Sequence, residues 1–167
     1  MPAGDAIVRA TILASIVLYG GAEYLWFRHR VRAFALRRAL WSAAFVLCVI
    51  HVARAFDVHH GWSHAAAEAH TAEVTARVTG IESGVGIYVN YAFLALWAAD
   101  VGWAWLAAPR YLRRGPGVSA VISATFLFMI FNGAVVFASG PARGTGLAVT
   151  ATVLWAWWRG HDTIVAV

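Results

Sequence analysis

Five long stretches of mostly apolar residues divide the chain, and short polar segments separate them. They cover residues 6–27, 39–56, 85–108, 118–139 and 142–158. A helix needs about 20 predominantly apolar residues to cross a bilayer, and lipid offers no partner for unpaired backbone groups, so helices are the expected spanning structures. The pattern predicts an all-α fold: a polytopic transmembrane helical bundle of five spans in a single domain, residues 1–167, with the fifth span at the short end.

The polar segment at residues 57–83 interrupts this pattern and has helical features of its own. From Trp62 to Val78 it is rich in Ala, Glu and His and contains neither Pro nor Gly. Ser63 is a suitable N-cap, and Gly80 is a suitable residue to end the helix. We expect a short interfacial helix here, lying at the membrane surface.

The composition also favours a membrane protein over a soluble domain. Of the 167 residues, 61% are hydrophobic and 13% are charged, whereas soluble domains average about 45–50% apolar and about 25% charged residues. The single cysteine, Cys48, excludes an intrachain disulfide and a CxxC metal site. The N-terminus has no basic segment before its apolar run, so we expect the first stretch to be retained rather than cleaved as a signal peptide.

The arginines predict the orientation in the membrane. The link between the first two stretches contains Arg28, Arg30, Arg32, Arg37 and Arg38, and the link between the third and fourth contains Arg110, Arg113 and Arg114. The positive-inside rule places both links in the cytoplasm. The predicted localisation is a bacterial-type inner membrane, with the N-terminus and segment 57–83 outside and the C-terminus cytoplasmic.

The same charge distribution limits the expected partners. The formal net charge is +5, but most of it lies in the links between spans. The charge therefore does not indicate nucleic acid as a partner. The lipid bilayer is the first expected partner. A second is another membrane protein, either a further copy of this chain in a homo-oligomer or a larger membrane complex.

Five of the seven histidines lie between positions 51 and 70. His60, His64 and Glu68 are spaced i, i+4, i+8, which on a continuous helix places them in one stripe. Two imidazoles one turn apart, with a carboxylate as third ligand, can bind a transition metal such as zinc, copper or iron. The histidine/carboxylate cluster therefore predicts a metal site, and whether it would catalyse a reaction stays open.

This stripe conflicts with the predicted cap at Ser63, because Gly61 would then separate His60 from the following helix. In that case a loop would bring His60 to the ion, and His59, His70 or His51 would join or replace members of the ligand set. The alternative is a solvated, histidine-rich interfacial segment that binds no metal.

Polar residues within the apolar stretches predict a cluster below these histidines. The cluster comprises Arg54, Tyr88, Asn90, Tyr91 and Asn132, with His51 beside it. Ionisable groups at membrane depth are functional candidates because lipid makes them costly. Two other interpretations stay open: Arg54 extends to the membrane surface, and the asparagines hold helices together.

Two acidic residues, Glu23 and Asp100, lie at comparable depth in the other half of the predicted bundle. We expect them to form ion pairs with link arginines such as Arg28 or Arg110, and a proton path from Asp100 outward is the alternative.

The HxxxH element at His60 and His64 faintly resembles one histidine box of the membrane di-iron hydroxylases and desaturases. That family requires further HxxHH-type boxes on the cytoplasmic side, which this chain lacks, so the resemblance implies no shared chemistry. Besides a metal-dependent membrane enzyme or redox protein, the sequence allows a haem b-binding bundle with His51 as ligand, and a non-catalytic subunit or scaffold. A channel is a further option, although no inverted repeat supports a transporter.

Overall fold

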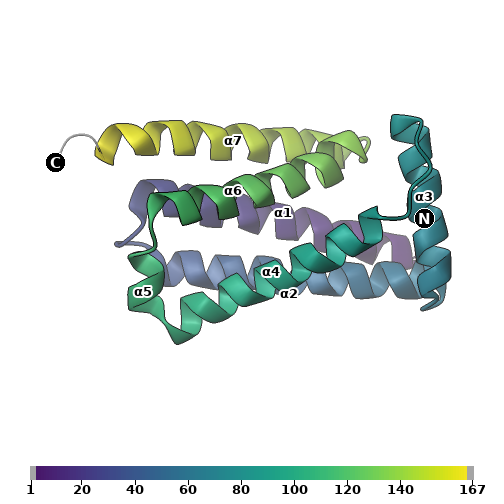
Figure 1. The fold of residues 1–167 in the computed structure, drawn as a ribbon, viewed down its shortest axis with the longest axis horizontal. Coiled ribbons are helices and arrows are strands. Elements are labelled where there is room, and N and C mark those ends of the chain that lie inside the picture. The colour runs from purple at the N-terminus through teal and green to yellow at the C-terminus, as the bar shows by residue number, and fades with distance from the viewer. Residues whose placement is uncertain (1–2, 165–167) are drawn as a thin grey trace.

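The computed structural model describes the backbone of residues 3–164 and the side chains from Gly4 to Gly160. The regular structure in this part of the chain is helical. Five long helices run side by side with alternating direction (Figure 1). They are α1 (Ala3–His29), α2 (Phe34–His60), α4 (Gly86–Leu106), α6 (Pro116–Phe131) and α7 (Pro141–Ile164), and a π-helical segment, η1 (Asn132–Val136), extends α6. The last residues of the expected cytoplasmic C-terminus, 165–167, lie outside the described part.

Three helical segments of the described chain are long and apolar enough to cross a membrane: Gly4–His29, Phe34–His60 and Pro116–Val136. The remaining long helices have 21 residues (α4) and 24 residues (α7). In α4, polar and amphipathic residues such as Tyr88, Asn90 and Asp100 interrupt the apolar sequence. The all-helical fold is confirmed and the three segments indicate a membrane protein, while the number of five spans stays a prediction.

Helix α3 (His64–Thr79) lies across one end of the bundle, roughly perpendicular to the long helices (Figure 1). Ser63 caps it by accepting a hydrogen bond from the backbone N–H of Ala66 at 3.2 Å. Gly80, in the left-handed conformation with φ of 78°, ends it. Both residues therefore act as the sequence indicates, and the helix forms a roof over this end, which we call the histidine end.

The opposite end contains the turn between α1 and α2 and the short helix α5 (Ala108–Leu112), which precedes α6. The two links that contain most of the arginines meet here, so we call it the arginine end. Pro116, the first residue of α6, suits this position because its fixed φ is compatible with a helix start and its missing N–H would be unpaired there anyway.

An aromatic core holds the long helices together at mid-height. The rings of Trp41 and Phe126 lie 4.7 Å apart, and those of Trp97 and Phe126 lie 5.0 Å apart. Tyr19 completes the group from α1 and is fully buried. Cys48 belongs to the same buried cluster.

Helix α7 packs closely on η1 through one glycine. A Cβ atom added at Gly146 would lie 2.6 Å from the Cβ of Ala134 and 3.0 Å from its backbone. Such a distance is too short for two carbon atoms, so a side chain here would force the two segments apart. Gly144, one half-turn earlier, has open space around it.

We predict that Gly146→Ala lowers the stability of the purified protein by about 1–3 kcal/mol through this overpacking. Gly144→Ala is the matched control and should be neutral or stabilising, since alanine is the better helix former. Heating each variant in detergent with a thiol-reactive dye measures unfolding as exposure of the buried Cys48. Equal melting temperatures for the two variants would contradict the close contact.

Candidate functional site at the histidine end

The end of α2 and the start of α3 determine where the histidines lie. Helix α2 ends at His60, because Gly61 adopts the left-handed conformation with φ of 52°. Trp62 follows with a positive φ of 62°, which is uncommon for a residue with a side chain. These two residues turn the chain through the link, so His60 is the last residue of one helix and His64 is the first of the next.

The predicted stripe of His60, His64 and Glu68 is therefore divided. His64 and Glu68 share a face of α3, with Nε2 of His64 3.8 Å from Oε2 of Glu68. His60 lies on the other helix, and it has no contact with either of them. A continuous helix through Gly61 was required for the stripe, and the left-handed glycine prevents it.

His64 instead connects α3 to α4. Its Nδ1 lies 3.1 Å from the hydroxyl oxygen of Tyr91, and its Nε2 lies 3.4 Å from that of Tyr88. Tyr88 in turn donates to the Glu68 carboxylate at 3.4 Å. These polar contacts hold the roof helix on the bundle, which gives His64 and Glu68 a structural role.

His60 has a different neighbour, His70, which lies within α3. The centres of the two rings are 5.3 Å apart and the rings are inclined by 52°. His59 lies on the other side, with its ring 6.2 Å from that of His60, and its Nε2 is 3.8 Å from the Asp5 carboxylate of α1. The structure thus brings three of the predicted histidines into one row, although in a combination that spacing did not predict.

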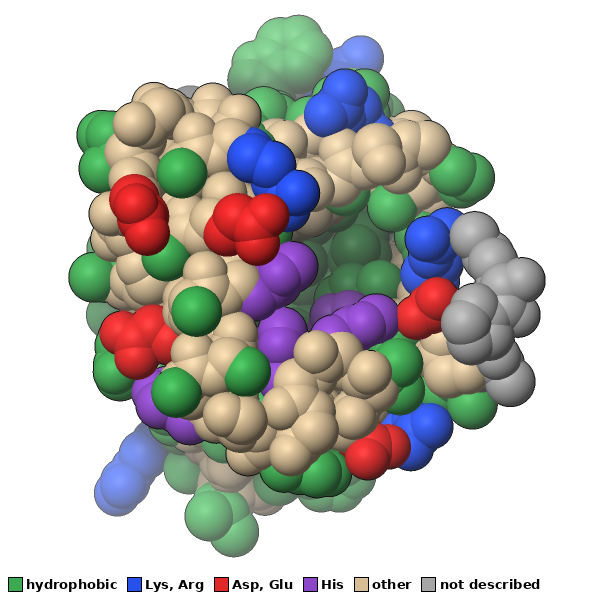
Figure 2. All heavy atoms as spheres, turned by 90° about the vertical axis from the view of Figure 1, so that its right-hand side faces the viewer, with side chains coloured by type: hydrophobic (Ala, Val, Ile, Leu, Met, Phe, Trp, Pro, Cys, Tyr) green, Lys and Arg blue, Asp and Glu red, His purple; other side chains and the backbone are tan. Residues whose placement is uncertain are grey.

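A cavity opens below this row (Figure 2), where histidines border a hollow with hydrophobic side chains at its floor. Its volume is about 630 Å³, and His70 of α3 and Asn132 of η1 are among its lining residues. A smaller cavity of about 220 Å³ lies deeper and reaches Cys48 and Trp97. Both cavities share His51, Asn90, Met129 and Gly133, so these residues lie between the two.

His51 is held at this junction by α1. Its Nδ1 lies 2.9 Å from the backbone carbonyl oxygen of Val8, an acceptor, which requires the proton to be on Nδ1. The other nitrogen, Nε2, then carries a lone pair and has no hydrogen-bond partner among the described residues. It is available to accept a hydrogen bond or bind a metal.

The predicted polar cluster is only partly assembled. Asn90 and Asn132 line the cavity with His51, whereas Tyr88 and Tyr91 face α3 at His64. Arg54 pairs with Asp57 one turn further along α2 at 2.6 Å, and both side chains are about 40% exposed. Arg54 therefore extends to the surface, as the alternative interpretation allowed.

Within the described residues, no group of three or more His, Cys, Asp or Glu side chains converges as a complete metal site would require. The close pairs among these residues are His60 with His70, His64 with Glu68 and His59 with Asp5. Comparisons with known protein families, with curated proteins and with solved structures find no match.

A second polar assembly, at the arginine end, joins Glu23 and Asp100 to arginines of the expected links, although to Arg37 and Arg114 rather than to Arg28 and Arg110. Nη2 of Arg37 lies 3.6 Å from Glu23, and Nη1 of Arg37 donates to the Tyr111 hydroxyl. Tyr111 donates to Asp100 at 2.7 Å, and Arg114 donates to the same carboxylate at 3.0 Å. All five side chains are buried. Burial raises the pKa of Tyr111, which keeps its hydroxyl protonated and able to donate.

The expected partners of these acids, Arg28 and Arg110, are both exposed. The sequence did contain a signal for Arg37: it lies on the same face of α2 as Trp41, Ala44 and Cys48, which are all buried. An arginine in register with core residues must be buried with a partner.

We predict that Arg114→Met destabilises the protein by about 3–5 kcal/mol, because it leaves the buried Asp100 carboxylate without its cation. Arg113→Met is the matched control, since Arg113 is exposed, and it should change stability by no more than about 0.5 kcal/mol. Chemical unfolding in mixed micelles, followed by tryptophan fluorescence, compares the two. Similar losses for both variants would show that the buried pair is not the cause.

Proposed function

We propose that this chain crosses the membrane five times, with the histidine end outside and the arginine end in the cytoplasm. Support comes from the antiparallel arrangement of five long helices (Figure 1) and from the arginines in the turns at one end. Helix α4, with 21 residues, is about 32 Å long, which matches the hydrocarbon thickness. Its tyrosines, tryptophans and asparagine lower its hydropathy without shortening it.

Labelling of introduced cysteines tests this topology in a Cys48→Ala background. Glu73→Cys on α3 should react with a membrane-impermeant maleimide in intact cells, whereas Arg113→Cys should react only after permeabilisation. Ser139→Cys and Arg159→Cys test α7 in the same way, with Ser139 expected outside. If Arg113→Cys and Glu73→Cys are labelled from the same side, α4 does not cross the membrane.

We further propose that the protein binds a transition metal ion between His60 and His70, next to the cavity of about 630 Å³ that His70 lines. The observation that carries this proposal is the 5.3 Å separation of their ring centres. Metal–nitrogen bonds of about 2.0–2.1 Å at a tetrahedral angle place two imidazole centres about 5 Å apart. The two rings come from different helices, so the ion would also fix α3 on α2.

A two-histidine pair leaves further coordination positions to be filled. His59 is adjacent and would complete a three-histidine set by a change of side-chain rotamer, which releases it from Asp5. Three protein ligands and one open position are the usual arrangement of a catalytic zinc site, in which the ion activates a bound water. Zinc, copper and iron all suit imidazole ligands, and the cavity below provides space for a ligand beside the ion.

We predict that His60→Ala and His70→Ala each reduce the affinity for Zn²⁺ or Co²⁺ by at least about 100-fold, since even partners outside the coordination sphere contribute 10–100-fold. His29→Ala, at an exposed position of α1 at the arginine end, is the matched control and should keep the parental affinity. Equilibrium dialysis followed by elemental analysis measures the bound ion. Binding should also weaken at acidic pH, because an imidazole must be neutral to bind a metal.

Two outcomes of this experiment would contradict the proposal. If His60→Ala and His70→Ala bind metal like the parent protein, the pair is not a ligand set. If His29→Ala loses the ion as well, the losses in the other two variants are not specific to the pair.

Haem b binding is a second candidate, because His51 and His70 line the same cavity of about 630 Å³ and His51 has a free Nε2. Apolar residues such as Val89, Phe128 and Phe137 form much of the remaining wall. A reduced-minus-oxidised absorption spectrum of the membrane-purified protein distinguishes the candidates, since haem gives a Soret band and a simple metal ion gives none.

A further inference from the structure

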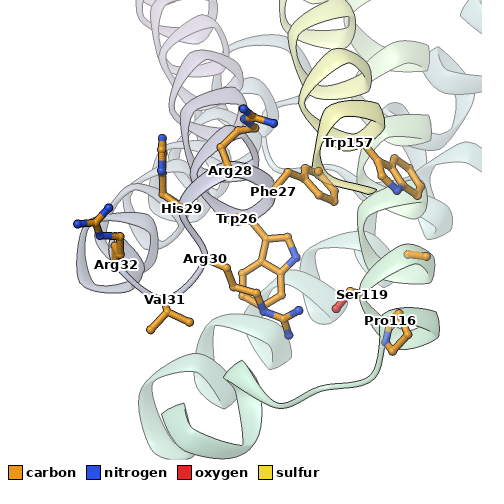
Figure 3. A pocket seen from close by; sticks show the side chains of 12 residues that line it. Trp26, Phe27, Arg28, His29, Arg30, Val31, Arg32, Pro116, Ser119 and Trp157 are labelled. Atoms are coloured by element: carbon orange, nitrogen blue, oxygen red, sulfur yellow. The ribbon is translucent and has the colours of Figure 1, made fainter. Parts of the chain in front are cut away.

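A separate cavity of about 380 Å³ opens at the arginine end, far from the histidines. It lies between the last turn of α1 and the first turn of α6, where two candidate membrane spans end. Figure 3 shows Trp26, Phe27 and Trp157 around it, with Ser119 and Pro116 of α6 on the facing side. Phe27 and Trp157 stack with ring centres 5.6 Å apart, so an apolar wall continues from the cavity toward the membrane.

Three arginines, Arg28, Arg30 and Arg32, also line this cavity. Among the described residues none of them has a carboxylate partner, because Glu23 and Asp100 are already bound by Arg37 and Arg114. The cavity is therefore lined by positive charge that no carboxylate of the described side chains neutralises. A net positive field of this kind attracts anions from the membrane surface.

Arg30 is the arginine that reaches furthest into the cavity. Its guanidinium lies 4.0 Å from the centre of the Trp26 ring, and Figure 3 shows the side chain passing Trp26 toward Ser119. Nη2 donates to the carbonyl oxygens of Leu112 and Arg114, at 2.7 and 3.1 Å, which fixes the group in place. Its Nη1 has no hydrogen-bond partner among the described residues and is free to bind an anion.

The start of α6 adds a second source of positive potential. Helix α6 begins at Pro116, so the backbone N–H groups of its first turn have no partner within the helix. Together with the helix dipole, such groups favour a negatively charged ligand. Both the arginines and this helix end lie at the same cavity.

We propose that this cavity binds an anionic phospholipid, with the phosphate at Arg30 and the start of α6. The acyl chain lies against Phe27 and Trp157, and Arg28 and Arg32 at the rim contact the outer part of the headgroup. Charge complementarity determines the headgroup, because no acidic side chain between Gly4 and Gly160 lines the cavity. The apolar wall and the position at the end of two spans indicate a lipid rather than a soluble anion.

The binding test uses the full-length protein in a neutral, mild detergent with labelled phosphatidylglycerol as the probe. Phosphatidylcholine tests whether an anionic headgroup is required, and inorganic phosphate tests whether a soluble anion occupies the same site. We expect phosphatidylglycerol to bind at least about tenfold more tightly than phosphatidylcholine. Inorganic phosphate at millimolar concentration should not displace it.

Two pairs of matched variants locate the site. Arg28→Gln with Arg32→Gln should weaken phosphatidylglycerol binding about 30-fold, given about 1 kcal/mol per arginine near a lipid surface. Arg110→Gln with Arg113→Gln removes the same charge from exposed positions outside the cavity and should leave binding almost unchanged. Ala120→Phe fills the cavity without changing charge and should prevent binding, whereas Ala124→Phe, one turn away and outside it, should not.

The dye reaction of Cys48 confirms that each variant is folded before binding is compared. Equal binding of phosphatidylcholine and phosphatidylglycerol would overturn the proposal, as would equal losses from the two arginine pairs. Displacement by inorganic phosphate would assign the cavity to a soluble anion, and unchanged binding in Ala120→Phe would place the lipid elsewhere.

Discussion

The structure depends on the buried network that joins Glu23, Arg37, Tyr111, Asp100 and Arg114. An unpaired ion at this depth would cost several kcal/mol in desolvation, so each charge requires its partners to be in place at the same time. These partners come from α1, α2, α5, α4 and the link before α6, respectively. The network therefore specifies one arrangement of these segments, because any shift of one helix along another would leave a buried charge unpaired.

Aromatic rings strengthen this arrangement on the sides that carboxylates do not cover. The Arg37 guanidinium lies 4.4 Å from the centre of the Trp41 ring, and that of Arg114 lies 4.1 Å from the Trp26 ring. Such cation–π contacts are most favourable where water is excluded. Because Glu23 and Asp100 pair with these buried arginines, Arg28, Arg30 and Arg32 have no acidic partner among the described side chains.

The two ends of the bundle differ in how their polar groups are satisfied. At the arginine end, ions are buried and paired with each other. At the histidine end, polar and apolar side chains line a cavity, and a π-helical segment at Asn132–Val136 extends α6 next to it. π-Helical segments occur frequently at functional sites, because the extra residue in the turn exposes backbone and redirects side chains. Buried ion pairs thus hold the arginine end together, whereas the histidine end contains a cavity.

The sequence predicted the helices well and the sites poorly, and the difference has a physical reason. Apolar length determines which segments become long helices, and local signals at Ser63, Gly61 and Gly80 determine where α3 begins and ends. These signals act within a few residues. The pairing of His60 with His70, and of Asp100 with Arg114, depends on how helices pack across the bundle, and no spacing along the chain contains that information.

The turn at Gly61 and Trp62 is a local signal that also affects the geometry of the proposed metal site. His60 is fixed at the end of α2, and His70 is fixed on α3, so their separation depends on the angle between the two helices. That angle is set by two successive left-handed residues, one of which, Trp62, is in an unfavourable conformation for a residue with a side chain. The contacts of His64 with Tyr88 and Tyr91 hold α3 against α4 and thereby compensate the strain. His64, which binds no metal in our proposal, thus helps to position the pair that does.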